Sequence, residues 1–318
     1  MKKLTRRQFA ATVASGLSVL ANSGSFAESL PQSPPSAAEQ RYSLQNTFGL
    51  ALAVDAKTGS YAVQYGGERW LGAGHVSVLE NKQWYGSAAQ PELAGRSRAG
   101  KLVLTGAKTG ASADFLGSYQ SVELAWEVPD SAAAFSTGFK LYSDAPCVVF
   151  FQKFPRGFKN YASGSWIVPS VVFPQFQAGF DERNDLYSWT SGGMFTHRFG
   201  YGNAASVGGT VDLLLLADPT YKTLILSPYA NYLVATQQCA PAASRDETNP
   251  SKGAINCGIE GLVEDLPAGF EHEHILMAGQ GIGETFRAWG AALLKRAGKQ
   301  IPSKYAGDTL KYPVYWDD

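Results

Sequence analysis

The segment Ser121-Val122-Glu123-Leu124-Ala125-Trp126-Glu127-Val128 decides the predicted fold. Its large apolar side chains stand at every second position, with polar or small residues between them. A period of two is typical of a β-strand that buries one face and exposes the other to water. The segment therefore predicts a strand in an antiparallel sheet that has one solvated face.

The same alternation continues on both sides of this segment. It recurs in two apolar sets, each on a single parity: Phe48, Leu50, Leu52 and Val54, and Phe135, Thr137, Phe139 and Leu141. Fuller apolar runs at 147–151, 211–217 and 223–226 suit central strands. About a dozen or more strands fit between residues 47 and 278, too many for an immunoglobulin-size sandwich of about 100 residues. We predict an all-β fold, a large antiparallel two-sheet β-sandwich (a supersandwich) over residues 45–278.

Composition supports this fold class and excludes several functions. The 318 residues are 45% hydrophobic, 12% aromatic and 17% charged, which favours β-structure and excludes bulk disorder. Lys+Arg and Asp+Glu both number 27, so charge gives no reason to expect a nucleic acid partner. The body of the chain has no uncharged apolar run of 18 residues, so we expect no membrane span after signal cleavage.

One α-helix is predicted after the sandwich, at the start of the C-terminal region 279–318. Phe286, Trp289, Leu293 and Ala297 recur with helical spacing on one face, and Gly298 supplies a stop. Gly279, Gly281 and Gly283 precede this helix, and we interpret them as a tight strand-to-helix turn rather than a dinucleotide site.

The N-terminus has the features of an export signal. Arg6-Arg7 precede a mild apolar run, and Ser25-Phe26-Ala27 supplies the small residues of a cleavage site, as in twin-arginine signals. We predict a signal peptide over residues 1–27 and a periplasmic or secreted protein; the alternative is a basic tail on a cytoplasmic protein. The Pro-, Ser- and Gln-containing residues 28–44 predict a disordered linker, up to about Tyr42.

Three cysteines raise the question of a disulfide in an exported protein. Cys239 and Cys257 flank a polar segment, which is consistent with a stapled surface loop; the alternative is two free thiols. Cys147 opens an apolar run, so we expect a buried structural thiol there. No C-x-x-C spacing occurs, so metal binding by cysteines is not expected.

The run Glu271-His272-Glu273-His274 is the other candidate metal site. In a strand the two histidines share one face and could ligate zinc, but no third ligand is identifiable. We interpret the run as an edge strand with a solvated face, and we predict no metal and no cofactor.

Two aromatic and polar segments are candidates for a sugar-binding groove. One contains Phe158 to Tyr161 with Trp166, and the other contains Asp185, Trp189 and His197. Aromatic rings stack on apolar sugar faces while carboxylates hold hydroxyls, so we nominate Trp166, Asp185 and Trp189 as carbohydrate-binding residues. The alternative is that the aromatics are core and the charges a solvated loop. No G-x-S-x-G motif and no convincing carboxylate pair occurs, so the catalytic residues stay unknown.

The C-terminal residues resemble a known family. The matching segments are Ala278-Gly279-Gln280-Gly281-Ile282, Trp289-Gly290-Ala291-Ala292-Leu293-Leu294, Gly298-Lys299, Asp308-Thr309-Leu310-Lys311-Tyr312 and Tyr315-Trp316-Asp317. They resemble glycoside-hydrolase-like proteins of the α-galactosidase/raffinose-synthase type, in which a galactose-mutarotase-like sandwich precedes a (β/α)8 barrel. The resemblance implies that Tyr315 to Asp317 begin the first barrel strand, and that Trp316 and Asp317 bind carbohydrate. A barrel takes about 250 residues and the sequence stops at Asp318, so the resemblance gives no catalytic residue that can be carried over to this chain.

Two functional hypotheses follow. In the first, the chain is the exported β-sandwich module of a glycoside-hydrolase-like protein, non-catalytic alone, with carbohydrate and a separately encoded barrel as partners. In the second, it is a free-standing periplasmic carbohydrate-binding or structural β-sandwich protein. A third and weaker hypothesis, catalysis by an epimerase-like sandwich, has only His75, His197, His272 and His274 to draw on. Whether the chain is an enzyme is left open.

Overall fold

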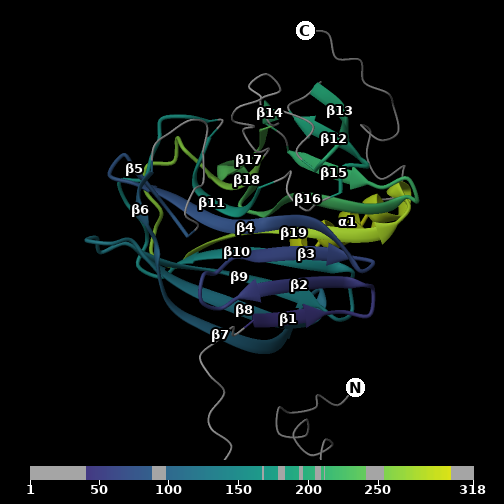
Figure 1. The fold of residues 1–318 in the computed structure, drawn as a ribbon, viewed down its shortest axis with the longest axis horizontal. Coiled ribbons are helices and arrows are strands. Elements are labelled where there is room, and N and C mark those ends of the chain that lie inside the picture. Colours follow the sequence, from purple (N-terminus) through teal and green to yellow (C-terminus); the bar gives the residue numbers. More distant parts are fainter. Residues whose placement is uncertain are drawn as a thin grey trace, which may run out of the picture. The chain divides into compact units, whose positions relative to one another are not determined.

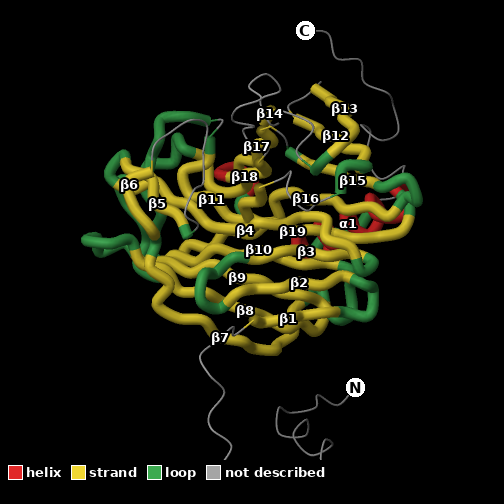
Figure 2. The backbone as a smooth tube through the Cα atoms, viewed as in Figure 1, coloured by secondary structure: helices red, strands yellow, loops and turns green. Residues whose placement is uncertain are grey.

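Alternating apolar residues build two β-sheets in the computed structural model, which describes residues 41–87, 98–166, 168–177, 183–192, 196–204, 209–210, 212–240 and 254–301. These residues contain 19 strands, one α-helix and the short 3-10 helix η1 (Tyr232–Val234), all within one structural unit, residues 39–318. The strands form two stacked layers (Figures 1 and 2). The predicted all-β sandwich followed by one helix is confirmed.

The first sheet has ten strands. In hydrogen-bonded order, eight of them are β1 (Arg41–Gln45), β2 (Leu50–Asp55), β3 (Tyr61–Tyr65), β4 (Glu68–Glu80), β11 (Pro169–Gln177), β18 (Ala254–Glu260), β17 (Ala235–Ala240) and β14 (Gly209–Thr210). The other two, β5 (Gln83–Gly86) and β6 (Arg98–Lys101), extend from β4. β5 and β6 pair in parallel, whereas β4 and β5 pair antiparallel.

The second sheet has nine strands. Their order is β13 (Thr196–Gly202), β12 (Leu186–Gly192), β15 (Leu213–Ala217), β16 (Lys222–Ala230), β19 (Phe270–Gln280), β10 (Cys147–Phe154), β9 (Ala134–Tyr142), β8 (Gly117–Glu127) and β7 (Val103–Asp114). The apolar runs that predicted central strands correspond to β10, β15 and β16. All three lie inside this sheet, as expected for strands that bury both faces.

One apolar core fills the space between the sheets. Val122, Leu124 and Trp126 of β8 point into it and are almost fully buried, so the period-two pattern that predicted this strand is confirmed. From the opposite sheet, the Tyr61 ring packs edge-on against Phe139, with centroids 4.9 Å apart. Edge-on aromatic pairs of this kind add to the stabilisation from apolar burial.

The helix α1 (Ile282–Ala297) covers the outer face of the nine-stranded sheet. A second apolar cluster joins its Ala292, Phe286 and Trp289 to Ile225 of β16 and Met277 of β19. The helix ends at Gly298, whose left-handed φ of 62° lets its N–H donate to the carbonyls of the last turn. The predicted helix and its glycine stop are both confirmed.

The run Glu271 to His274 lies in a central strand, so the predicted edge strand is wrong. β19 pairs with β10 and β16, and His272 and His274 point into the core with 0% exposure and ring centroids 4.9 Å apart. Burial lowers the pKa of His272 to about 3 and that of His274 well below its usual value. Alternating Glu and His give the same pattern at an edge or in the centre, so the pattern could not locate the strand.

The opposite face of β19 carries a buried charge. The Glu273 carboxylate, 5% exposed, lies 3.0 Å from Lys140 Nζ of β9 and 2.5 Å from Arg296 Nη1 of α1. This ion-pair network attaches the helix to the outer face of the nine-stranded sheet. Buried charges of this kind require such partners, because removing an unpaired carboxylate from water is strongly unfavourable.

The ends of the sandwich differ slightly from the prediction. β1 begins at Arg41, within the segment 28–44 predicted as linker, and β19 extends past residue 278 to Gln280. The predicted signal peptide with Arg6 and Arg7, and the predicted barrel start with Trp316 and Asp317, lie outside the described residues. In the part of the chain that the structure describes, no helix is long and apolar enough to cross a membrane.

Candidate functional site

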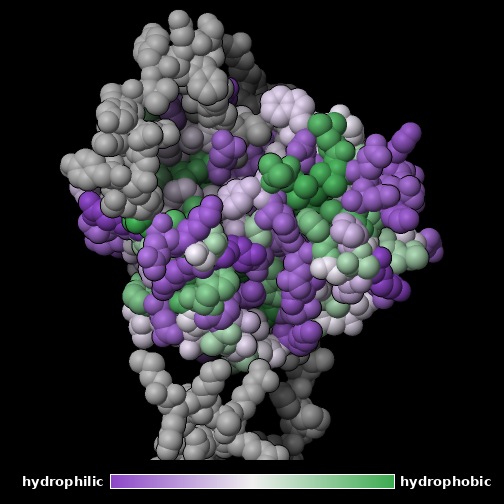
Figure 3. All heavy atoms as spheres, turned by 180° about the vertical axis from the view of Figure 1, so that it is seen from behind, coloured by the Kyte–Doolittle hydropathy of each residue, from purple (hydrophilic) through white to green (hydrophobic). Residues whose placement is uncertain are grey.

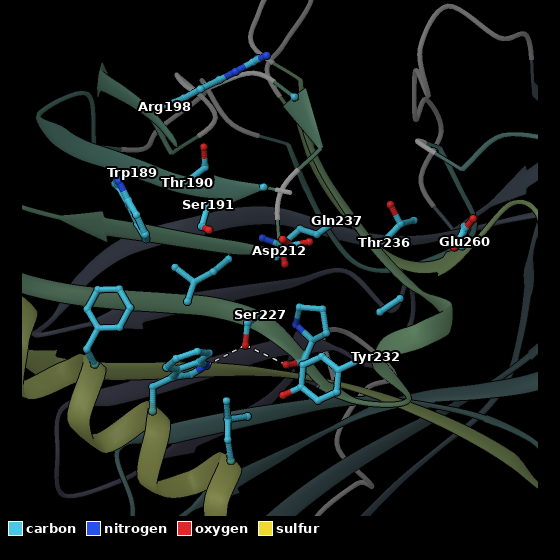
Figure 4. A pocket seen from close by; sticks show the side chains of 18 of the residues that line it. Trp189, Thr190, Ser191, Arg198, Asp212, Ser227, Tyr232, Thr236, Gln237 and Glu260 are labelled. Atoms are coloured by element: carbon cyan, nitrogen blue, oxygen red, sulfur yellow. Dashed lines mark hydrogen bonds between the residues drawn. The ribbon is translucent and has the colours of Figure 1, made fainter. Parts of the chain in front are cut away.

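A cavity of about 1080 Å³ opens where α1 meets the ends of both sheets. Three tryptophans from distant parts of the chain line it: Trp166 from the β10–β11 loop, Trp189 from β12 and Trp289 from α1. Figure 4 shows this cavity from close by, and the surface seen from behind is hollowed in its upper half (Figure 3). The rest of the lining comes from β12, β13, β14, β15, β16, η1, β17, β18 and α1, or from residues beside these elements.

One wall of the cavity is aromatic and held in a fixed geometry. The Phe286 ring lies 6.0 Å from both Trp189 and Trp289, each in an edge-on arrangement. The Trp289 indole Nε1 donates a 2.9 Å hydrogen bond to Ser227 Oγ, which in turn donates to the Pro228 carbonyl at 2.9 Å. Because these side chains are already ordered, a ligand that stacks on them pays little of the usual ordering cost.

The opposite side of the cavity is polar. Thr236 of β17 and Glu260 at the end of β18 lie across the cavity from Trp189, and Gln237 of β17 and Asp212 overlap near the middle of the view (Figure 4). Gln237 is anchored to the other sheet, since its Nε2 donates to the Leu226 carbonyl at 3.4 Å. Aromatic rings facing amide, hydroxyl and carboxylate groups suit a ligand with apolar faces and hydroxyl edges.

The sequence-predicted groove residues separate into two groups. Trp166 and Trp189 both line the cavity, so the structure brings these two together. Phe158 and Tyr161 belong to the same predicted groove segment as Trp166, but they are buried in the core between the sheets. The alternative interpretation, that the aromatics are core, therefore applies to these two residues.

Asp185 does not line the cavity. Arg183 holds both of its carboxylate oxygens, with Nε–Oδ1 at 2.8 Å and Nη2–Oδ2 at 2.6 Å. This hydrogen bonding by Arg183 lowers the pKa of Asp185. Arg183 also pairs with Glu68 of β4, at 2.5 Å, and with the buried Asp218 at 2.9 Å, so it ties the two sheets together. The geometry gives Asp185 a structural contact rather than a place in the cavity.

Sequence reasoning missed several lining residues. The helical spacing places Trp289 on the apolar helix face, and the family resemblance includes it in a matching segment, but neither assigns it to a sugar-binding groove. Tyr232, Ser227 and Gln237 carried no local signal, since single polar residues near strand ends are common. Only strand order brings β16, β17 and α1 to the same cavity.

The predicted disulfide differs from what the structure shows. Cys239 and Cys257 are free, buried thiols on the neighbouring strands β17 and β18. Cys239 pairs with Ile255 and Cys257 with Gln237, so the cysteines are diagonal neighbours. Diagonal positions lie about 7–8 Å apart, beyond the usual Cα separation of a disulfide. Both are core residues rather than ends of a stapled surface loop; Cys147 is buried, as predicted.

Within the described ranges, no group of three or more His, Cys, Asp or Glu side chains is arranged to hold a metal ion. His272 and His274 are both fully buried, and Nδ1 and Nε2 of each ring have no hydrogen-bond partner. Two imidazoles alone fall short of the three or four protein ligands of zinc sites.

Comparison with protein-family models gives no match, and comparison with curated proteins gives none either. Solved structures do match. The chain is similar to α-N-acetylgalactosaminidase NagBb from Bifidobacterium bifidum in a GalNAc complex, with a TM-score of 0.53 and 10% identity over 81% of this chain and 39% of that one. The ligand-free form of the same enzyme matches at 0.50 with 11% identity and the same coverage. An α-galactosidase from Lactobacillus brevis matches at 0.49 with 12% identity, covering 81% of this chain and 42% of that one.

The two NagBb matches have TM-scores of 0.53 and 0.50 at 10% and 11% identity, so they show a similarity of fold alone. The chain therefore has a β-sandwich fold that also occurs within a glycosidase, as the resemblance of its C-terminal residues implied. It spans about two fifths of the length of NagBb, corresponding to the 39% coverage.

Proposed function

We propose that this chain is the carbohydrate-binding β-sandwich of a glycoside-hydrolase-like protein, and that the cavity beside α1 binds a sugar. One observation carries the proposal: Trp166, Trp189 and Trp289 line the same cavity as Thr236, Gln237 and Glu260. The fold shared with part of NagBb supports the same class of ligand.

The cavity offers each part of a sugar a suitable contact. The aromatic wall would stack on the apolar face of a sugar ring, while the polar side would accept and donate hydrogen bonds to its hydroxyls. Trp189 and Trp289 are oriented before binding by Phe286 and Ser227. Binding in this manner needs no cofactor.

Isothermal titration calorimetry with galactose and with N-acetylgalactosamine tests the proposal. We expect saturable binding that weakens by about tenfold in Trp189→Ala, because a stacked ring contributes about 1 kcal/mol or more beyond its burial. Trp166→Ala should weaken it as well, and this variant leaves the α1 packing intact because Trp166 is 61% exposed. Phe48→Ala is the matched control, since Phe48 is 44% exposed and lies outside the cavity lining.

Two results would contradict the proposal. One is the absence of saturable binding across a wider panel of neutral mono- and oligosaccharides. The other is an unchanged affinity in both tryptophan variants, which would place any sugar elsewhere on the protein.

We also propose that the chain is exported by the twin-arginine pathway, on the basis of Arg6-Arg7 and the small residues before position 28. Expression of the full chain followed by N-terminal sequencing of the periplasmic fraction should give a first residue of Glu28. Arg6→Lys combined with Arg7→Lys should leave the precursor uncleaved in the cytoplasm. Cleavage and export that continue in this double variant would contradict a twin-arginine signal.

A further inference from the structure

The hairpin formed by β12 and β13 exposes three aromatic side chains. Tyr187 is 54% exposed, Phe199 81% and Tyr201 61%. β13 is the edge strand of the nine-stranded sheet, so this hairpin lies at one side of the sandwich, as Figure 1 shows. Exposed aromatic residues that gather on one element indicate a binding surface more often than scattered ones do.

The three side chains share the outer face of the hairpin. Tyr187 is directly opposite Tyr201, and their ring centroids lie 5.0 Å apart. Phe199 is opposite Trp189, which stands two residues from Tyr187 on the same face. Side chains two residues apart on a strand are separated by about 6.5–7 Å, so these rings form one surface. We call Tyr187, Phe199 and Tyr201 the aromatic platform.

The platform continues directly from the cavity through Trp189. This residue lines the cavity and packs on Phe286, while across the hairpin it pairs with Phe199 and stacks on His197, with ring planes 16° apart. Ser191, which also lines the cavity, is opposite His197 on the same face. Polar and aromatic groups therefore extend without a break from the cavity onto the open hairpin.

We propose that the cavity and the aromatic platform form one extended site, and that its ligand is an oligosaccharide rather than a single sugar. One sugar unit occupies the cavity, and the following units lie over Tyr187, Phe199 and Tyr201. This proposal rests on the proposed function, because it extends the ligand of the same cavity.

The size and chemistry of the platform favour a glycan over a protein partner. Three partly exposed rings offer roughly 300–500 Å² of surface, from about 150–250 Å² for each buried aromatic side chain. A stable protein interface buries about 800 Å² on each partner. The two tyrosine hydroxyls and His197 supply hydrogen-bonding groups beside the rings, which suits a ligand with an apolar face and polar edges.

Chain length is the variable that tests this inference. Galactose, melibiose, raffinose and stachyose carry the same terminal galactose on progressively longer chains, and calorimetry would compare their affinities for the full chain. We expect affinity to rise by about tenfold from galactose to the longer members, for about 1.4 kcal/mol of added contact. In the double variant Tyr187→Ala/Tyr201→Ala this gain should disappear while galactose still binds with wild-type affinity. Phe48→Ala should keep both the galactose affinity and the gain in affinity with chain length.

The outcomes separate the two proposals. If galactose binds, but chain length or the double variant has no effect on affinity, the extended site is wrong and the cavity proposal stands. If neither galactose nor any longer member binds, the cavity proposal itself fails. If sedimentation velocity shows a dimer that the double variant abolishes, the platform belongs to a second copy of the chain and the extended site is overturned.

Discussion

The indole Nε1 of Trp289 donates a 2.9 Å hydrogen bond to Oγ of Ser227, and this contact joins α1 to β16 beside the cavity. Ser227 is 1% exposed with the indole in place, and both residues belong to the cavity lining. The contact therefore links the stability of the helix docking to the shape of the aromatic wall.

A double-mutant cycle measures this link. We expect Ser227→Ala and Trp289→Phe to be coupled by about 0.5–1.5 kcal/mol in the free energy of unfolding, the net range for such a hydrogen bond. Urea unfolding of the two single variants and the double variant supplies the value. Trp166→Phe is the control and should change the unfolding free energy by less than about 0.5 kcal/mol, because Trp166 is 61% exposed. Additive single effects would show that the hydrogen bond contributes nothing.

The buried histidine pair predicts a pH dependence of stability. Burial lowers the folded-state pKa of His272 to about 3 and that of His274 well below its usual value, whereas both return to about 6.5 on unfolding. The unfolded chain therefore binds more protons below pH 6.5, and folding loses stability as the pH falls through that value. Each histidine should lower the free energy of unfolding by about 2 kcal/mol when the pH falls from 8 to 5.

Urea unfolding at several pH values checks this dependence. His272→Leu should remove about half of the acid-induced loss, since one of the two buried imidazoles is gone. His197→Asn is the matched control, because His197 lies on the exposed hairpin and should leave the dependence unchanged. An unfolding free energy that does not change between pH 8 and pH 5 would contradict the buried neutral pair.

Arg183 should be far more important to stability than an exposed arginine. It is 16% exposed and pairs with Asp218, which is 2% exposed, while Glu68 and Asp185 are about half exposed. Arg183→Met leaves Asp218 buried with only its hydrogen bonds to Thr220 and Lys222, and should destabilise the fold by about 2–3 kcal/mol.

Arg287→Met provides the comparison for the Arg183 variant. Arg287 pairs with Glu284 on the surface of α1, where both side chains are more than 70% exposed. We expect a change below about 1 kcal/mol, as for most surface ion pairs. Equal effects of the two variants in thermal or urea unfolding would show that Arg183 does not connect the sheets.

All three cysteines should behave as protected free thiols. Burial raises the pKa of Cys147 and Cys239 to about 12 and that of Cys257 well above its usual value. Alkylation with iodoacetamide in denaturant, without reductant, should add three groups by mass, whereas the native protein should add none. Two thiols that stay unmodified in denaturant would indicate a disulfide between Cys239 and Cys257, contrary to the structure.

The fold class follows from the order of the amino acids, because the polarity of neighbouring residues is enough to define a strand with one buried face. Val122, Leu124 and Trp126 predicted β8, and Phe286 and Trp289 predicted a face of α1, since each pattern depends on residues within one element. Trp166 and Trp189 were nominated on the same local grounds and both line the cavity.

Tertiary structure alone decided which elements meet. Alternation does not specify strand order, so it could not show that His272 and His274 lie in a central strand. Nor could it show that Asp185 is held by Arg183, or that Trp189 of β12, Trp289 of α1 and Gln237 of β17 share one cavity. The physical reason is that burial of an apolar face is satisfied by many strand orders, whereas a site requires one particular set of long-range neighbours.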